Sequence, residues 1–239
     1  MITTLRLSLV LILACGCGFA QLAIKGKLLL ADDFKSPAVY TGHLPDDAQS
    51  PDAYTQGFQP VAPGWRVGVW HAEWRHTANG IKSVWTEGHM PVLAYEGSFR
   101  NVIIEVDFRF AKEPGKWSAC RVSAINPELN PRAYSVSVWA NADDKDRPLG
   151  VVLEHDEWAP GKTTTVGNTP ASFKPNRWYT LRLETINDEA LVTVNGVQAS
   201  GRHEKFGLPK TMIVIGTGTS PHELRRLRVW EALPAKPKP

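Results

Sequence analysis

One short polar run holds most of the residues suited to acid–base chemistry. Glu154, His155, Asp156 and Glu157 are consecutive, and Trp158 follows them. An imidazole transfers protons near neutral pH, paired carboxyl groups cleave glycosidic bonds, and an indole offers a flat surface to a sugar ring. In an extended strand Glu154 and Asp156 face one way and His155 the other. We take Glu154, His155 and Asp156 as candidate catalytic residues and Trp158 as a candidate substrate-binding residue; the alternative is a polar strand end without a role.

Glu105 and Asp107 form a second carboxylate pair. Residues two apart in a strand share a face at about 7 Å, which suits one acid and one base or nucleophile. We therefore include both among the candidate substrate-binding residues. The alternative is a solvated strand face on which Arg109 neutralises its neighbours, because alternating charge is typical of an exposed antiparallel face.

Trp139 shares its predicted strand face with Ser135 and Ser137, opposite Val136 and Val138. An indole among small hydroxyls indicates the open floor of a sheet, where a sugar could stack, so these three residues are candidate substrate-binding residues. Packing of Trp139 under a neighbouring loop is an equal alternative.

Metal ligands are less well supported. Asp143, Asp144 and Asp146 offer oxygen atoms of the kind that Ca²⁺ prefers, but their spacing does not match an EF-hand, and a plain turn is the simpler interpretation. His71 and His76 lack the spacing of a helical zinc site. We expect no cofactor, with Ca²⁺ at the three aspartates as the exception to test.

The charge balance excludes one class of partner. The chain has 239 residues, 27 Lys and Arg, and 24 Asp and Glu. Arg6 lies in the leader described next, and Lys236 and Lys238 lie in the Pro-rich tail; removing these three leaves 24 basic against 24 acidic residues. A neutral body gives no electrostatic reason to bind nucleic acid, so we expect a small neutral glycoside or glycan instead.

Residues 1–20 are typical of a secretory signal peptide. Arg6 precedes an apolar run from Leu7 to Ala14, and small residues end the segment at Ala20. The run is shorter than the roughly 20 residues of a transmembrane helix. Cleavage after Ala20 would release a secreted or periplasmic protein. Alternatively, Ile12-Leu-Ala-Cys15 resembles a lipobox, and a lipid on Cys15 would anchor the protein to a membrane surface.

The rest of the chain alternates with period two. Val102–Phe110 and Tyr134–Trp139 are typical of half-buried strands, and Asn195-Gly196 predicts a tight hairpin. No segment has a convincing helical stripe. About a dozen short strands without helices predict an all-β, two-sheet antiparallel jelly-roll sandwich. We expect one domain over residues 21–233 followed by a tail over 234–239, an irregular surface loop from Ser36 to Pro63, and a buried Cys120.

The order of these signals resembles a known fold family. The chain is similar to the concanavalin A-like lectin and glucanase jelly rolls and, more narrowly, to the bacterial 3-keto-disaccharide hydrolase domain family, over roughly Leu28 to Ala232. The motifs that carry this resemblance are Asp32-Asp-Phe34, Gly64-Trp65, Trp70, Asn79-Gly80-Ile81, Phe99–Phe110, Asn176-Arg-Trp178-Tyr-Thr-Leu, Val194-Asn-Gly196 and Glu223–Glu231. The resemblance implies that Trp65, Trp178 and Trp230 are core residues.

The resemblance also implies an activity, with one departure. Arg121 matches an arginine of that family, where it would orient a hydroxyl or keto oxygen, and Tyr134 matches a tyrosine. Ser135 stands where the family has a glutamate. The resemblance therefore implies a secreted hydrolase of a glycosidic bond, acting on a neutral sugar such as a 3-keto disaccharide. The alternatives are a non-catalytic carbohydrate-binding domain, which Ser135 favours, and a cell-surface interaction domain.

Overall fold

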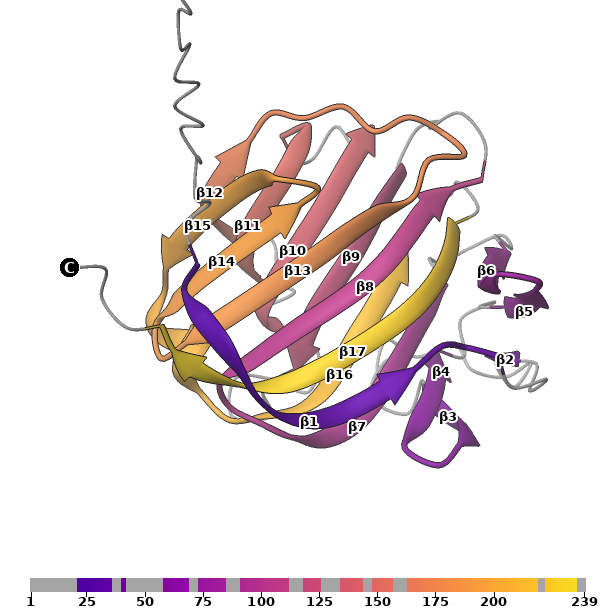
Figure 1. Cartoon of the computed structure of the whole chain (residues 1–239), viewed down its shortest axis with the longest axis horizontal. Coiled ribbons are helices and arrows are strands. Elements are labelled where there is room, and N and C mark those ends of the chain that lie inside the picture. Colours follow the sequence, from indigo (N-terminus) through magenta and orange to yellow (C-terminus); the bar gives the residue numbers. More distant parts are fainter. Residues whose placement is uncertain are drawn as a thin grey trace, which may run out of the picture.

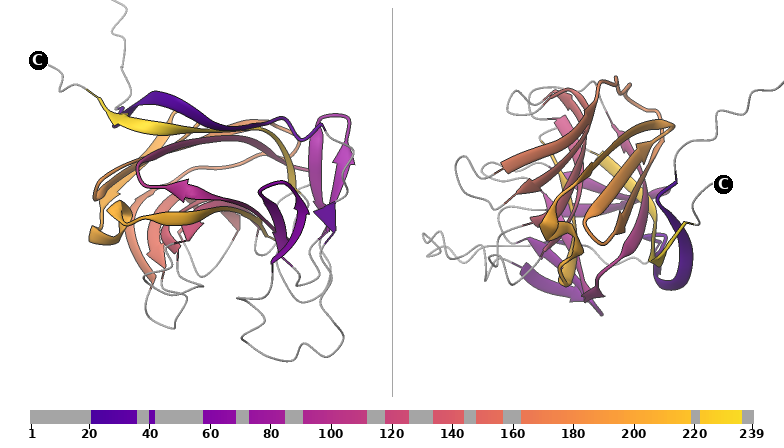
Figure 2. Two further views of the ribbon diagram at one scale, coloured as in Figure 1. Left: turned by 90° about the horizontal axis from the view of Figure 1, so that it is seen from below. Right: turned by 90° about the vertical axis from the view of Figure 1, so that its left-hand side faces the viewer.

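The protein is a sandwich of two antiparallel sheets (Figures 1 and 2). The structure, a computed structural model, describes residues 21–35, 40–41, 58–68, 73–84, 91–111, 118–125, 134–143, 148–156, 163–218 and 222–235. The predicted leader over residues 1–20 and the end of the tail lie outside these ranges. No helix within them is long and apolar enough to span a membrane.

The sheet nearer the viewer in Figure 1, here the front sheet, has nine strands. In spatial order they are β15 (Val197–Arg202), β14 (Glu189–Val194), β13 (Tyr179–Ile186), β8 (Val102–Phe110), β17 (His222–Pro234), β6 (Gly80–Val84), β5 (Glu73–Thr77) and β2 (Tyr40–Thr41), and β1 (Ala23–Asp32) also pairs with β17.

The back sheet has eight strands. In spatial order they are β12 (Thr163–Thr169), β11 (Gly150–Asp156), β10 (Tyr134–Asp143), β9 (Ser118–Ile125), β16 (Lys210–Thr217), β7 (Val92–Phe99), β4 (Trp65–Gly68) and β3 (Phe58–Ala62). A short 3₁₀ helix, η1 (Glu204–Gly207), precedes β16. Neighbours far apart in sequence, such as β9 and β16, confirm the predicted jelly roll.

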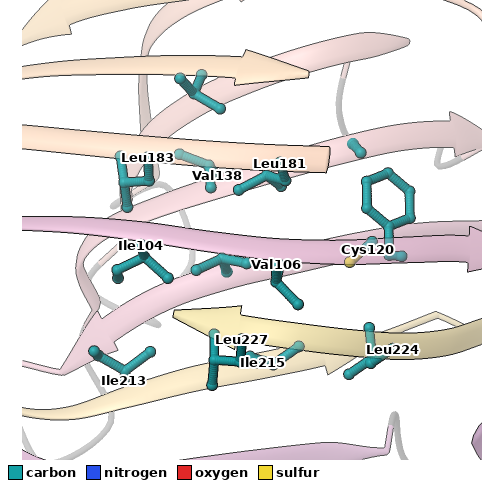
Figure 3. Close-up of a cluster of buried hydrophobic side chains, with 14 of the residues drawn as sticks. Ile104, Val106, Cys120, Val138, Leu181, Leu183, Ile213, Ile215, Leu224 and Leu227 are labelled. Atoms are coloured by element: carbon teal, nitrogen blue, oxygen red, sulfur yellow. The ribbon is translucent and has the colours of Figure 1, made fainter. Parts of the chain in front are cut away.

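The core lies between the two sheets and follows the period-two pattern. Figure 3 shows side chains from both layers that meet there. The front sheet contributes Ile104, Val106, Leu181, Leu183, Leu224 and Leu227, and the back sheet contributes Cys120, Val138, Ile213 and Ile215. Cys120 is fully buried, as predicted, and burial raises the pKa of its thiol.

Turns and short strands show where the sequence prediction was right and where it was wrong. Asn195 and Gly196 both have positive φ between the paired Val194 and Val197, which confirms the hairpin. The predicted loop from Ser36 to Pro63 was wrong in part, because it contains β2 and β3. Both are short strands at sheet ends, too brief for a period to be recognised.

Two of the three predicted core tryptophans lie elsewhere. Trp65 is 4% exposed and belongs to the core, but Trp178 and Trp230 are only partly buried on the outer face of the front sheet. The guanidinium of Arg225 lies 4.0 Å from the Trp178 ring, and Lys25 Nζ lies 3.7 Å from the Trp230 ring. Trp230 follows the core residue Val229, so alternation turns its side chain outward.

Candidate functional site

Polar side chains gather on the outer face of the back sheet, the face turned away from the core. Core residues alternate with outward residues in three adjacent strands, β9, β10 and β11. Arg121 of β9 pairs with Trp139 of β10, and in the next row Ser137 lies between Ser123 of β9 and Glu154 of β11. Because paired residues share a face, the register brings these five side chains together.

Trp139 is the centre of this group. Its Nε1 donates a hydrogen bond of 2.5 Å to Oε1 of Glu154, and the Arg121 guanidinium carbon lies 5.2 Å from its ring. Glu154 is 0% exposed, Arg121 1% and Trp139 3%. Buried charges of opposite sign and a charge-assisted hydrogen bond hold the indole in one orientation. The indole is therefore packed rather than open.

Further polar groups extend the face along the strands. The hydroxyls of Ser123 and Ser137 are 2.7 Å apart and share a hydrogen bond. Asp156, which points to the same side as Glu154, accepts a bond of 3.0 Å from the Thr163 hydroxyl. The buried Asn141 donates to the carbonyl of Pro148 at 2.9 Å. Hydroxyl, carboxylate and amide groups in one patch are suited to holding the hydroxyls of a sugar.

Gly216 makes room for the arginine. It pairs with Arg121 across β9 and β16, and a Cβ at this position would lie 3.2 Å from Nε of Arg121 and 3.3 Å from Nη2. The guanidinium thus lies over the backbone of β16. Sequence reasoning missed Ser123 and Gly216. The alternation that selects Arg121 also selects Ser123, so that residue could have been found.

Beside the polar patch the same face is apolar. Ala119 and Val152 pack against Trp139. A second cluster joins residues of β7, β9 and β16: Val92, Ala94, Ile125 and Val214, with Met212 against them. The polar patch therefore has an apolar border on each side, as ligand sites commonly have.

His155 is separated from its two acidic neighbours. It faces the interior, and its ring stacks on that of His203 at 4.2 Å with 18° between the planes. His203 lies between β15 and η1, and its Nδ1 accepts the backbone N–H of Lys205. The structure therefore places Glu154 and Asp156 on the candidate face and His155 on the opposite face of β11, as the alternation predicted.

Glu105 and Asp107 belong to β8 of the front sheet (Figure 1), where they alternate with the core residues Ile104 and Val106. Their side chains therefore lie on the outer face of this sheet, on the other side of the molecule from the candidate face. Glu105 forms ion pairs with Arg182 at 2.7 Å and Lys25 at 3.0 Å. Asp107 is bonded by two arginines described below. Both carboxylates are thus neutralised and far from Arg121, although Arg109 bonds Glu223 rather than either of them. The alternative of a solvated face neutralised by Arg109 is right only in its charge balance, because other basic residues supply that balance and Asp107 is buried.

Several predicted site residues lie outside what the structure describes. Trp158, Glu157, Asp144, Asp146 and the lipobox cysteine Cys15 are among them. The backbone of Asp143 ends β10, and that of Ser135 lies next to a register shift in the same strand. Within the described ranges, no group of three or more His, Cys, Asp or Glu residues could hold a metal ion.

Comparison with known proteins supports a carbohydrate-related domain. A family model described as 3-keto-alpha-glucoside-1,2-lyase-like domain matches residues 56–229, which include strands of both sheets and the whole candidate face. No curated protein sequence matches the chain significantly.

Solved structures show the same fold at low identity. The carbohydrate-binding module CBM66 from Bacillus subtilis has a TM-score of 0.55 at 12% identity, over 70% of this chain and 96% of its own. A Bacillus subtilis protein of unknown function with a galectin-like fold has a TM-score of 0.54 at 11% identity, over 89% and 100%. SCLam, a non-specific endo-beta-1,3(4)-glucanase of family GH16, has a TM-score of 0.50 at 16% identity, over 89% and 95%.

Proposed function

Because the chain belongs to the 3-keto-alpha-glucoside-1,2-lyase-like domain family, we propose that it cleaves the glycosidic bond of a 3-keto glycoside on the outer face of the back sheet. The observation that carries the proposal is the contact group of Arg121, Trp139 and Glu154, which places a cation, an indole and a carboxylate on one face. The fold of the relatives and the family match favour a sugar as the ligand.

The chemistry needs three groups. A carbonyl at C3 acidifies the hydrogen on C2, so a base can remove that proton while a cation stabilises the enolate oxygen. The C2–H electron pair then forms the C1=C2 double bond as the C1–O bond breaks, and the departing oxygen takes a proton. Addition of water across this double bond returns the 3-keto sugar, so the same first step gives a lyase or a net hydrolase.

Each group has a candidate in the patch. Arg121 would hold the C3 oxygen with its guanidinium N–H donors. Glu154 would accept the C2 proton, with its Oε1 oriented by the Trp139 N–H. Asp156, the next carboxyl group on this face of β11, would return a proton to the leaving oxygen. The hydroxyls of Ser123 and Ser137 would bind sugar hydroxyls.

Burial affects both catalysis and access. Arg121, Trp139 and Glu154 are at most 3% exposed, so the charge of Arg121 acts at low dielectric and stabilises an enolate strongly. At this burial a sugar would contact the three side chains directly only by displacing the groups that cover them.

A second function is favoured by one observation. Ser135 stands where the family resemblance places a glutamate. If that carboxylate is required for turnover and Glu154 does not replace it, the protein would bind a sugar without cleaving it.

The test is turnover of a chromogenic 3-keto α-glucoside, with the unoxidised glucoside as a control. We expect leaving-group release from the keto substrate only, and a loss of about 10²–10⁴ in kcat for Glu154→Gln. Glu231→Gln changes an exposed carboxylate of β17 and is the matched control, with unchanged kcat. If the unmodified protein binds the keto substrate without cleaving it, the catalytic function is rejected and the sugar-binding function is supported.

A further inference from the structure

A separate cavity of about 350 Å³ lies on the outer face of the front sheet, on the opposite side of the sandwich from the candidate face. It lies beside a bulge in β17, where the register with β8 shifts between Arg225 and Arg228. Asp33, Lys35, Asn79, Asp107, Arg225 and Arg226 line it. We call it the bulge cavity. Its volume falls within the range of small-molecule sites.

Asp107 orients the two arginines. Its carboxylate is 3% exposed and accepts three bonds: from the Thr180 hydroxyl at 2.7 Å, from Nη2 of Arg226 at 2.8 Å and from Nε of Arg225 at 3.2 Å. The Arg225 guanidinium also stacks on Trp178 at 4.0 Å. Both guanidiniums are thus held in fixed positions by contacts on one side.

These contacts use only part of each guanidinium. A guanidinium carries five N–H donors. Within the described part of the chain, Arg225 donates to Asp107 alone, and Arg226 donates to Asp107 and, at 3.5 Å, to Thr180. The two side chains are 39% and 57% exposed. Several donors therefore remain for a ligand, and a guanidinium fork matches the two oxygens of a carboxylate or sulfate.

Backbone strain concentrates at the same place. Among the described residues, five non-glycine residues have positive φ, and three of them are asparagines, which tolerate it. The other two, Phe34 at 53° and Arg226 at 52°, flank the bulge cavity. The Phe34 ring is fully buried, which fixes its neighbours Asp33 and Lys35 at the rim. Strain of this kind clusters at ligand sites, and bulges re-aim side chains there.

The β5–β6 hairpin packs closely against β17 and forms one side of the bulge cavity. Gly80 has φ of 148°, and a Cβ on it would lie 2.2 Å from the Leu224 carbonyl oxygen. Only glycine lets the β5–β6 turn approach β17 this closely, and the approach brings Asn79 to the rim of the cavity.

The charges at the cavity favour an anion. Lys35, Arg225 and Arg226 oppose Asp33 and Asp107, and Asp33 is already bonded by Arg228 at 2.7 Å. We propose that the bulge cavity binds the oxyanion of an acidic sugar, a carboxylate or a sulfate ester. We infer that the oxyanion is attached to a sugar because the chain belongs to a carbohydrate-related family. This inference does not depend on the chemistry proposed for the back sheet. The site differs from that face in taking a charged ligand.

The experiment is a calorimetric titration of the full chain with glucuronate, glucose 6-sulfate and glucose. We expect saturable binding of the acids that weakens with added salt, and none of glucose. Arg226→Asn keeps a residue that tolerates positive φ, so it should fold normally and bind at least tenfold more weakly. Arg202→Asn, which removes an exposed arginine from the far edge of the same sheet, is the matched control and should bind like the unmodified protein.

Three outcomes would overturn the proposal. They are no saturable binding of either acid, equal affinity in Arg226→Asn and Arg202→Asn, and binding of glucuronate to the unmodified protein that leaves the NMR signals of Arg225, Arg226 and Asn79 unshifted. The third readout needs no variant, so a folding defect in Arg226→Asn does not prevent a decision. Turnover of a neutral 3-keto glucoside should persist in Arg226→Asn, which separates this proposal from the proposed function.

Discussion

The indole N–H of Trp139 donates to Oε1 of Glu154 across the β10–β11 pair at 2.5 Å. Both side chains are almost fully buried, so this contact is a structural requirement as well as a feature of the candidate site. A buried carboxylate needs donors, and the indole supplies one while the Arg121 charge lies against its ring. The bond therefore couples the stability of the back sheet to the orientation of the proposed base.

Trp139→Phe should reveal that coupling. Phenylalanine keeps most of the apolar contact with Ala119 and Val152 but removes the N–H, so Glu154 loses a donor. We expect a loss of about 1–3 kcal/mol in the free energy of unfolding, measured by urea denaturation. If the bond carries this loss, Trp139→Phe should cost much less in a Glu154→Leu background, because leucine has no acceptor for the indole N–H. Equal losses in both backgrounds would show that packing alone is responsible.

The alternation of apolar and polar residues predicted much of the fold, because in a strand it shows which side chains are buried. The core residues Val106 and Val138 alternate with Asp107 and Trp139, and the structure places each pair on the expected faces. The same rule separated His155 from Glu154. Its failures have a physical cause as well. Strand β2 has only two residues, which is too short to show an alternation. The bulge in β17 has Arg226 at a position of positive φ, where a glycine or asparagine would have indicated it in the sequence.

The candidate site could be predicted only in part, because alternation is local to one sheet. It tells which residues point outward, but the outward faces of two packed sheets are opposite surfaces of the molecule. Glu105 and Arg121 are therefore equally outward and yet lie on different sides. The sheet that a strand joins depends on long-range pairing, such as that of β9 with β16, which no local pattern contains.

Cys120 should be inert in the folded protein. It is fully buried in the core, and burial raises the pKa of its thiol, so the reactive thiolate is scarce at neutral pH. Cys120 is the only cysteine among the residues that the structure describes, so the labelling is followed at this residue. We expect labelling by a thiol reagent only when the chain unfolds, with a rate that rises with urea. Fast labelling in native buffer would contradict a closed core at β9.

Glu184 should hold the start of β1 in place. Its Oε2 accepts the backbone N–H groups of Leu22 at 2.9 Å and Ala23 at 2.6 Å, and its Oε1 accepts from Arg182 at 2.7 Å. Glu184→Ala removes these acceptors and should cost about 2 kcal/mol in the free energy of unfolding. Hydrogen exchange should show faster exchange of the Leu22 and Ala23 amides, while the core amide of Ile104 stays protected. Unchanged exchange at Leu22 and Ala23 would contradict this role.

Lys210 should make stability rise with alkaline pH. Its ammonium group is buried and donates to three backbone carbonyls: Arg100 at 2.9 Å, Phe206 at 2.6 Å and Leu208 at 2.9 Å. Burial, together with the charge of Arg100, lowers the pKa of Lys210 from 10.5 to about 8. Between these two values the unfolded chain keeps a proton that the folded chain has released.

The sign of the effect follows from that difference in bound protons. Stability rises with pH wherever the unfolded state binds more protons, so the free energy of unfolding should increase from pH 8 toward 10.5, by up to about 3 kcal/mol from this group. Urea denaturation across that range measures the increase. Lys210→Gln keeps an amide donor near the carbonyls but does not titrate, so its stability should lack this contribution. If Lys210→Gln and the unmodified protein show the same slope between pH 8 and 10, the increase arises from another group, and the buried ammonium is stabilised by its three carbonyls enough to keep its proton.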